Sequence, residues 1–162
     1  MTAILYRKAG EWRVPFVVRR ADAPSHPGQV ALPGGGLHQG EDAWAAAARE
    51  AEEEIGVDGA SLQALGAGPP VYAAISNYSV VPFIAWLAHE PEPFAADPGE
   101  LTAVLEVPLD RLLDRAAWHQ NRPWPGPNLP VDGQVIWGLT AGLLAGLLPA
   151  IAAARAEDAG RS

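Results

Sequence analysis

The sequence predicts a mixed fold of the α/β or α+β class, and we take α/β as the fold class of this 162-residue chain. Segments rich in Ile, Leu, Val, Tyr, Phe and Trp recur along the chain as strand candidates. Residues 42–55 have the pattern of a strong helix, and residues 135–154 form a second, apolar helix candidate. No internal repeat or long linker divides the chain, so we expect a single domain spanning residues 1–162.

The strand candidates lie between segments rich in Gly and Pro, which disfavour strand interiors. The first candidate predicts two strands joined around Gly10, and the fourth carries Pro82, which favours an edge strand or a bulge. The last candidate changes to a helix after Pro108. The ranges are 3–20, 29–33, 71–76, 79–90 and 101–118.

The helix at residues 42–55 has signals at both ends, because Asp42 can cap its start and Gly56 can end it in a left-handed conformation. The C-terminal run at 135–154 contains Pro149 and has no basic anchor before it. We therefore interpret it as a buried helix rather than a membrane span. Residues 119–133 hold four prolines without periodicity and predict an irregular loop.

Charge and composition exclude several classes of protein. With 11 basic and 19 acidic residues the net charge is −8, which repels a nucleic-acid backbone, so we expect neither a nucleic-acid nor a membrane partner. A small phosphorylated ligand is compatible with this charge if a divalent cation screens it. The absence of cysteine excludes disulfides and thiolate metal sites, and the N-terminus lacks a signal-peptide pattern, so we expect a cytoplasmic protein.

Four glutamates occupy five positions near the end of the first helix: Glu50, Glu52, Glu53 and Glu54. At roughly 100° per residue, Glu50, Glu53 and Glu54 share one arc and Glu52 points away from it. Like charges at this spacing and at a helix C-terminus are unfavourable, and such local conflicts often mark functional sites. Converging carboxylates suit a hard divalent cation. The alternative is an ordinary solvated acidic face.

The glycine-rich segment before this helix strengthens the functional interpretation. Residues 32–36 read LPGGG, which allows the backbone to approach a ligand closely and a helix start to present N–H groups to phosphate. Small side chains at Ala43, Ala46 and Ala47 lie near the carboxylate arc and leave room for a ligand. The separate apolar stripe predicted to face the core comprises Trp44, Ala48, Ala51 and Ile55.

Residues 35–57, GGLHQGEDAWAAAAREAEEEIGV, resemble the box of the Nudix family, G-x5-E-x7-R-E-U-x-E-E-x-G-U with U apolar. The apolar positions hold Ala51 and Val57. The resemblance implies an α/β/α sandwich with a mixed sheet, and hydrolysis of a nucleoside-linked diphosphate with Mg²⁺ or Mn²⁺. The fixed positions hold Gly35, Glu41, Arg49, Glu50, Glu53, Glu54 and Gly56.

The family's roles can be carried over residue by residue. The resemblance implies that Glu50, Glu53, Glu54 and the backbone carbonyl of Gly34 bind the metal, and that Arg49 orients a box carboxylate. Glu41 would support the loop. The general base would be one of the box glutamates or an acid from a separate loop, so Glu53, Glu54 and Arg49 are the catalytic candidates. Glu100 and Glu106 are candidates for the extra acid, or surface residues.

A narrower resemblance lies upstream, where residues 26–35, HPGQVALPGG, are similar to the H-x-G-Q-V-x-F-P-G-G segment of the coenzyme A diphosphatases of this family. Segments at 97–113 and 136–144 also resemble that subgroup. The resemblance implies cleavage of coenzyme A to 3′,5′-ADP and 4′-phosphopantetheine. The substrate contacts it implies are Arg19, His26, Gln29 and Gly35.

In and before this segment the chain departs from the subgroup pattern, which begins L-L-T-x-R-S/A: PFV at residues 15–17 replaces L-L-T, although Arg19 matches the first Arg. Pro24 stands where a second Arg is expected, Arg20 replaces a small residue, and Leu32 replaces Phe. Other substrates therefore stay open, namely NADH, ADP-ribose or a nucleoside triphosphate, as does a non-catalytic Nudix-fold binding module. For Trp118 and Trp124 we favour core packing over stacking on a base. The sequence does not predict the oligomeric state.

Overall fold

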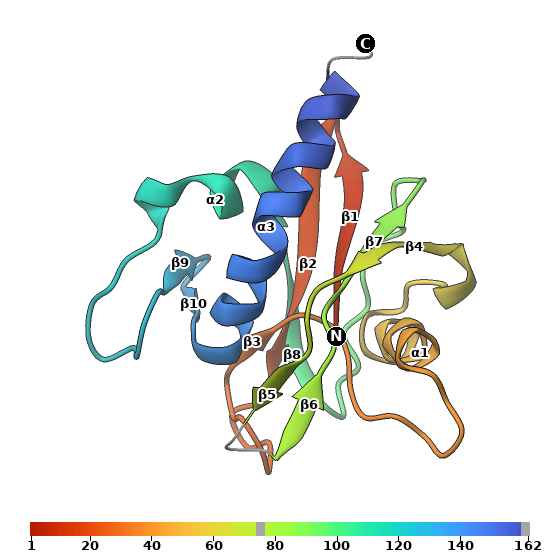
Figure 1. Cartoon of the computed structure of the whole chain (residues 1–162). Helices are drawn as coiled ribbons and strands as arrows, with labels where there is room; N and C mark the ends of the chain where they lie inside the picture. The colour runs from red at the N-terminus through yellow and green to blue at the C-terminus, as the bar shows by residue number, and fades with distance from the viewer. Residues whose placement is uncertain (74–76, 160–162) are drawn as a thin grey trace.

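A computed structural model describes residues 1–73 and 77–159 of the chain, and a mixed β-sheet occupies its centre (Figure 1). Strand order in the main sheet is β3-β2-β1-β7-β4, and β8 pairs with β2 from Arg13 to Arg19. The pair β1–β7 is parallel and the other pairs in this sheet are antiparallel. The strands are β1 Thr2–Lys8, β2 Glu11–Arg19, β3 Val30–Ala31, β4 Leu62–Ala67, β7 Phe83–Leu87 and β8 Leu101–Pro108.

Two short hairpins and three helices complete the described structure. The hairpins pair β5 (Val71–Ala73) with β6 (Tyr78–Val80), and β9 (Leu129–Val131) with β10 (Gln134–Ile136). The α-helices are α1 Ala43–Ile55, α2 Leu109–Leu113 and α3 Gly138–Ala159, and short 3₁₀ turns occupy Gly59–Ser61 and Arg115–Ala117.

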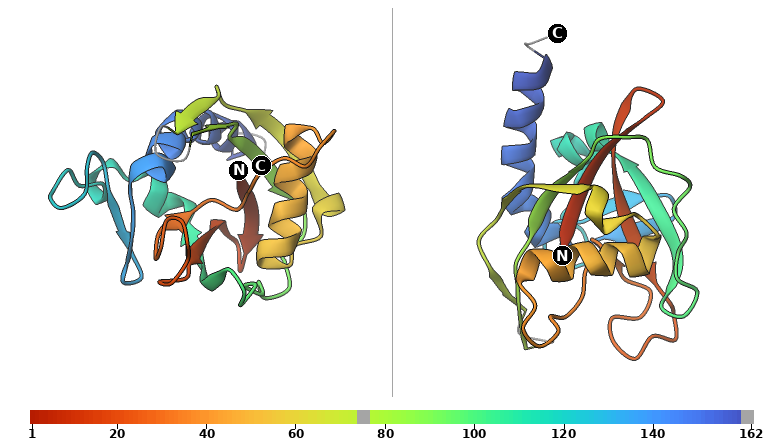
Figure 2. Two further views of the ribbon diagram at one scale, coloured as in Figure 1. Left: turned by 90° about the horizontal axis from the view of Figure 1, so that it is seen from below. Right: turned by 90° about the vertical axis from the view of Figure 1, so that its right-hand side faces the viewer.

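Helices cover both faces of the sheet, with α1 on one side and α2 and α3 on the other (Figure 2). Alternating strand residues supply the two cores: Ile4 and Val17 pack with Ile55 of α1, whereas Phe16 and Leu5 pack with helices α2 and α3. This arrangement is the α/β/α sandwich that the sequence predicted.

A β-bulge interrupts the pairing of β2 with β8 close to where the two strands end. Val18 pairs with Ala103, but Arg19 pairs with Leu101, so Thr102 is the extra residue. Leu101 then packs in the core on the α1 face, whereas Ala103 packs on the opposite face. The bulge therefore reverses the facing of the chain at the start of β8, just after the turn at 97–100.

The predicted helix at 42–55 is confirmed at both ends. Asp42 caps α1 by accepting hydrogen bonds from the backbone N–H groups of Trp44 and Ala45, and Gly56 adopts the left-handed conformation that ends it. The strand pair around Gly10 is confirmed as β1 and β2.

The strand predicted at 79–90 is wrong as a single element. β6 ends at Val80, β7 begins at Phe83, and Pro82 lies between them because it cannot donate a ladder hydrogen bond. β7 is also an interior strand, between β1 and β4. In the strand predicted at 71–76, residues 74–76 lie outside the described residues.

Two further predictions needed correction. The loop predicted at 119–133 contains β9, which was not predicted because it includes Pro130. An isolated bridge also joins His119 to Asn128. The C-terminal helix begins at Gly138 rather than 135, because Val135 and Ile136 belong to β10.

Helix α3 is apolar along most of its length but is buried on one face only. Within the described residues, its segment 138–156 is the one helix long and apolar enough to cross a membrane, judged by length and composition; 33% of the best window is buried. Leu144, Leu147 and Ile151 pack against the sheet, whereas small residues such as Gly146 and Ala150 are exposed. The prediction of a buried helix therefore holds for the inner face alone.

Candidate active site

Arg49, half-buried on α1, joins two carboxylates of the glutamate-rich segment to Glu41, which lies in the loop before the helix. Its Nη1 donates to Glu50 Oε1 at 2.8 Å and to Glu53 Oε2 at 3.2 Å. Its Nε and Nη2 donate to the two carboxylate oxygens of Glu41 at 2.9 Å and 3.1 Å. Nη2 also donates to the Gly36 carbonyl at 3.0 Å, so the glycine loop and α1 are tied by one planar group.

Glu41 supports the loop in the structure. Its carboxylate accepts from Arg49 and also from the backbone N–H of His38, at 2.9 Å. The Arg49 guanidinium, with the His38 N–H second, lowers the pKa of Glu41 to about 2. Hydrogen bonds to Glu41 and Glu50 raise the pKa of Arg49 further above its usual range. Both groups therefore remain charged at neutral pH.

Glu54 differs from the other box glutamates because it is only 4% exposed. The Gly34 N–H donates to its Oε2 at 2.9 Å, and no basic side chain among the described residues lies within ion-pair distance. Burial raises the pKa of Glu54 to about 7; the Gly34 N–H and the charge of Arg19 oppose the rise, and the charges of Glu50 and Glu100 add to it. A buried carboxylate with so little compensation is costly to keep ionised.

The glycine loop comes into direct contact with β1 and with α1. A Cβ on Gly35 would lie 2.4 Å from the Glu50 carboxylate carbon, which leaves room for no side chain. Gly34 has φ of +144°, and a Cβ there would lie 2.4 Å from the Met1 Cα. Gly35 is therefore needed because Glu50 lies so close. Gly34 is needed both because Met1 lies close and because its φ is positive.

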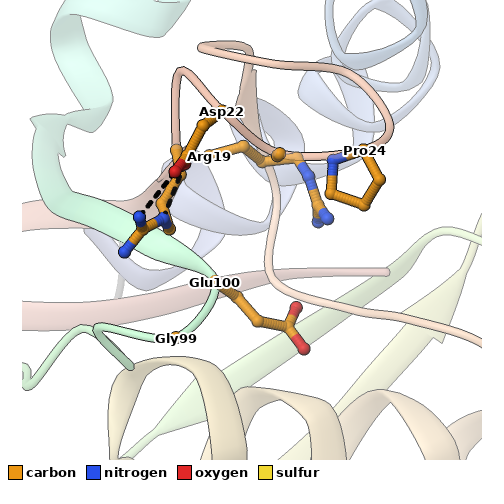
Figure 3. A pocket seen from close by; sticks show the side chains of 7 residues that line it. Arg19, Asp22, Pro24, Gly99 and Glu100 are labelled. Carbon is orange, nitrogen blue, oxygen red and sulfur yellow. Dashed lines mark hydrogen bonds and ion pairs between the residues drawn. The ribbon is translucent and has the colours of Figure 1, made fainter.

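Glu100 approaches the helix from a different element, the turn at 97–100. Figure 3 shows its side chain pointing from this turn toward α1. Its charge contributes to the raised pKa of Glu54, which places the two carboxylates near each other. Among the described residues Glu100 has no basic partner, whereas Glu106, near the other end of β8, is bonded to Lys8 and Tyr6.

A pocket of about 600 Å³ opens beside Glu100, between the end of β2 and the 97–100 turn (Figure 3). Arg19 lines it, and the Arg19 Nε donates to the Ser25 carbonyl at 3.3 Å. Within the described part of the chain no carboxylate pairs with Arg19. The pocket thus offers a cationic group next to the acidic cluster.

The other predicted substrate contacts lie in the loop between β2 and β3. His26 Nδ1 and Gln29 Oε1 are 3.2 Å apart, so these two side chains bond to each other. His26 has φ of +52°, a conformation that few residues other than glycine adopt. The structure therefore brings His26 and Gln29 together, but neither lines the pocket that contains Arg19.

The fit of a metal ion follows from the donor set. Among the described residues no three acidic or histidine side chains already converge as a formed metal site, because Glu50 and Glu53 bond to Arg49. The donors are nevertheless carboxylates, which hard divalent cations prefer, and Glu54 is buried without an ion pair to a basic side chain among the described residues. These residues fit a divalent cation bound near Glu54.

Two features of the site escaped the sequence analysis. Ala46 and Ala47 are each 2% exposed, so they pack in the interior and leave no room for a ligand. Glu54 likewise lies on the buried side of α1, although the helical arc placed it with Glu50 and Glu53. The pattern within the helix carried no sign of this burial, because it follows from the packing of α1 against the sheet.

Trp118 and Trp124, for which the alternatives were core packing and stacking on a base, contact other parts of the protein. Trp118 Nε1 donates to the Leu112 carbonyl at 2.9 Å, and Trp124 stacks on Trp137 with ring centroids 5.0 Å apart. Glu52 is exposed and its carboxylate accepts from the Gly59 N–H at 3.3 Å, away from Arg49.

Comparisons with known proteins agree with this geometry. A family model described as the NUDIX domain matches residues 1–125. The chain is 33% identical over 129 residues to an uncharacterized Nudix hydrolase, NudL, of Escherichia coli strain K12; the match covers 74% of this chain and 65% of the relative's length.

Solved structures show the same fold. M. smegmatis RenU, a Nudix hydrolase, matches with a TM-score of 0.60 and 18% identity over 94% of this chain and 84% of that chain. A C. elegans Ap4A hydrolase in a binary complex matches with a TM-score of 0.57 and 23% identity, over 67% of this chain and 78% of that chain.

Proposed function

The chain belongs to the Nudix family, and from that premise we propose that it is a metal-dependent hydrolase of a diphosphate linked to a nucleoside. One observation carries the proposal: Arg49 gathers Glu41, Glu50 and Glu53 beside the buried carboxylate of Glu54, which forms no ion pair with a basic side chain among the described residues. The chain spans 65% of the length of the curated relatives it matches, so the activity is proposed for the residues present here.

We assign residues 126–162 to the same domain as the family match, as one Nudix domain over 1–162. The support lies in the packing, because the elements after residue 125 complete the core on the α2 and α3 face. Leu129 of β9, Ile136 of β10 and Leu144 of α3 are each 0% exposed there.

In the proposed site Glu50, Glu53, Glu54 and the carbonyl of Gly34 hold Mg²⁺ or Mn²⁺. A cation bound there would offset the charge of the diphosphate and make a bound water more acidic. Arg49 orients Glu50 and Glu53 by its two Nη1 hydrogen bonds. The Gly34 N–H orients Glu54 through Oε2.

We propose that a carboxylate oxygen of Glu100 accepts the proton of the attacking water. Glu50 and Glu53 already share Arg49 and Glu54 is buried, whereas Glu100 is exposed, has no basic partner among the described residues and faces α1. A general base must reach the water, and an exposed side chain that points toward α1 from a separate turn can approach a water held beside the box carboxylates.

For the substrate we propose coenzyme A or a derivative, cleaved to 3′,5′-ADP and 4′-phosphopantetheine. Support comes from the segment that contains His26 and Gln29, whose side chains hold each other in place, and from Arg19, a cation without a carboxylate partner in the described chain. Gly35 lets the loop backbone lie close to the carboxylates, where the diphosphate would bind.

A substrate panel tests the proposal. Coenzyme A, dephospho-coenzyme A, NADH, ADP-ribose and a nucleoside triphosphate are each incubated with Mg²⁺ or Mn²⁺, and the product phosphates are identified by chromatography. We expect coenzyme A to be cleaved with the highest kcat/KM. Equal rates on coenzyme A and dephospho-coenzyme A would remove 3′-phosphate recognition, and no turnover of any compound would favour a binding module.

A further inference from the structure

Arg20 lies outside the box at residues 35–57, but its hydrogen bonds join several segments around the candidate site. Its Nη1 donates to the Pro98 carbonyl at 2.9 Å, and its backbone N–H donates to the Glu100 carbonyl at 3.1 Å. Nε and Nη2 bind the two oxygens of Asp22, each at 2.7 Å. Arg20 thus joins the end of β2 to both sides of the turn that carries Glu100.

The other end of this turn is attached to α1. The Asp97 N–H donates to the backbone carbonyl of Glu54 at 3.0 Å, and the Leu101 N–H closes the turn onto the Asp97 carbonyl at 2.8 Å. Hydrogen bonds therefore attach the turn to α1 at Glu54 and to the end of β2 at Arg20. Its position, and with it the direction of Glu100, depends on both attachments.

Asp22 keeps the Arg20 guanidinium in one orientation. A bidentate pair fixes the plane of the guanidinium, so the third hydrogen bond to Pro98 forms without further ordering of the side chain. The backbone carbonyl of Arg20 also accepts from the N–H groups of Ala23 and Gly28, each at 3.1 Å, which fixes Arg20 within its own loop. The Arg20 side chain is therefore held in place and is not free to bind a ligand. We call its bonds to Pro98 and Asp22, together with its backbone bond to Glu100, the Arg20 clamp.

We propose that Arg20 is a positioning residue for the hydrolysis: it holds the 97–100 turn so that Glu100 faces α1. This inference rests on the proposed function and on the role of Glu100 in it. Arg20 itself touches neither the box carboxylates nor Glu100's side chain. Its effect on catalysis therefore passes through Glu100.

Arg20→Ala removes the bonds to Pro98 and Asp22 but leaves the backbone bond to Glu100, so the variant keeps its fold. The side chain is 44% exposed, and an exposed ion pair contributes little to stability. With coenzyme A, or the panel compound that the wild type cleaves fastest, we expect kcat to fall about tenfold with KM within about twofold, since misplacement of a catalytic group costs rate. Arg20→Lys should recover activity to within about threefold of wild type, because its ammonium can still donate to Pro98.

Arg111→Ala is the matched control. Arg111 is also an exposed arginine that donates to a proline carbonyl, that of Pro130 at 3.3 Å, but it lies on α2. Its loss should leave kcat and KM unchanged. The decisive variant is Arg20→Ala combined with Glu100→Gln, which should be no slower than Glu100→Gln alone. A tenfold slowing on top of Glu100→Gln, or a rise in KM with kcat unchanged, would overturn the inference.

Amide hydrogen exchange gives a readout that needs no activity. The N–H groups of Glu100 and Leu101, which bond to the Asp97 carbonyl, should exchange about tenfold faster in Arg20→Ala and at the wild-type rate in Arg111→Ala. Unchanged exchange in Arg20→Ala would contradict the clamp even if the protein cleaved none of the panel. Faster exchange in a protein without turnover would retain the clamp and reject only the proposed function.

Discussion

The Glu50 carboxylate occupies the space that a side chain at position 35 would need, with its carboxyl carbon 2.4 Å from where a Cβ on Gly35 would lie. Gly35→Ala should therefore displace Glu50 rather than the backbone, because the carboxylate is the far end of a flexible side chain. We expect kcat/KM to fall at least about tenfold, with a higher Mg²⁺ or Mn²⁺ concentration for half-maximal rate. Steady-state kinetics over a metal titration measure both changes.

Gly36→Ala provides the comparison for that experiment. A Cβ on Gly36 would meet no atom within 4 Å, and the Arg49 contact uses its carbonyl, which alanine retains. Its kinetics should match wild type. Equal losses in the two variants would mean that loop flexibility, and not the space taken by Glu50, explains the result.

Neutral replacements on α1 separate the carboxylates by role. Glu53→Gln and Glu54→Gln should each lower kcat by about 100-fold or more, because the charge that binds the metal is lost. Glu52→Gln should retain wild-type kcat, since Glu52 contacts the Gly59 N–H instead of Arg49. Circular dichroism checks that all three variants fold. Full activity in both Glu53→Gln and Glu54→Gln would reject the assigned metal site.

The raised pKa of Glu54 predicts how the stability of the metal-free protein varies with pH. Between the usual carboxyl pKa and about 7, folded Glu54 binds more protons than it does in the unfolded chain. Its burial therefore costs stability above pH 7, and this cost disappears as the pH falls toward 4.5. In EDTA, Glu54→Gln should be more stable than wild type at pH 8, on the order of 3 kcal/mol, and nearly equal at pH 4.5. Urea unfolding at both pH values measures the difference.

Metal binding should act on stability as well as on rate. Mg²⁺ or Mn²⁺ would balance the Glu54 charge, so saturating metal should raise the unfolding temperature of wild type at pH 8 more than that of Glu54→Gln. EDTA should abolish hydrolysis, and added metal should restore it. A wild-type protein that keeps full activity in EDTA would contradict the proposed chemistry.

The sequence predicted the parts of the fold that local chemistry determines. Helix α1 was predictable from end to end because Asp42 and Gly56 act on their own neighbours. The α/β/α layers followed from the family resemblance. By contrast, β4 escaped prediction: five of its six residues are exposed, so it shows no alternation of apolar and polar positions.

The candidate site was predictable where it lies on one helix and not where separate segments meet. The spacing of Arg49 and Glu53 predicts their contact, since residues four apart share a helix face. The approach of the 97–100 turn, which carries Glu100, to Glu54 depends on strand pairing between distant segments, and the pattern within either segment carries no sign of it. The burial of Glu54 arises in the same way, from the packing of α1 on the sheet.

The extra residue in β8 has a consequence for how such a site can change. With Thr102 present, Leu101 faces α1; without it, strand alternation would turn Leu101 to the opposite face and draw the turn one residue into the sheet. The position of Glu100 relative to α1 therefore depends on the extra residue, Thr102, in β8. A lineage could gain or lose that acid by inserting or deleting one residue, while every position from 35 to 57 stayed the same.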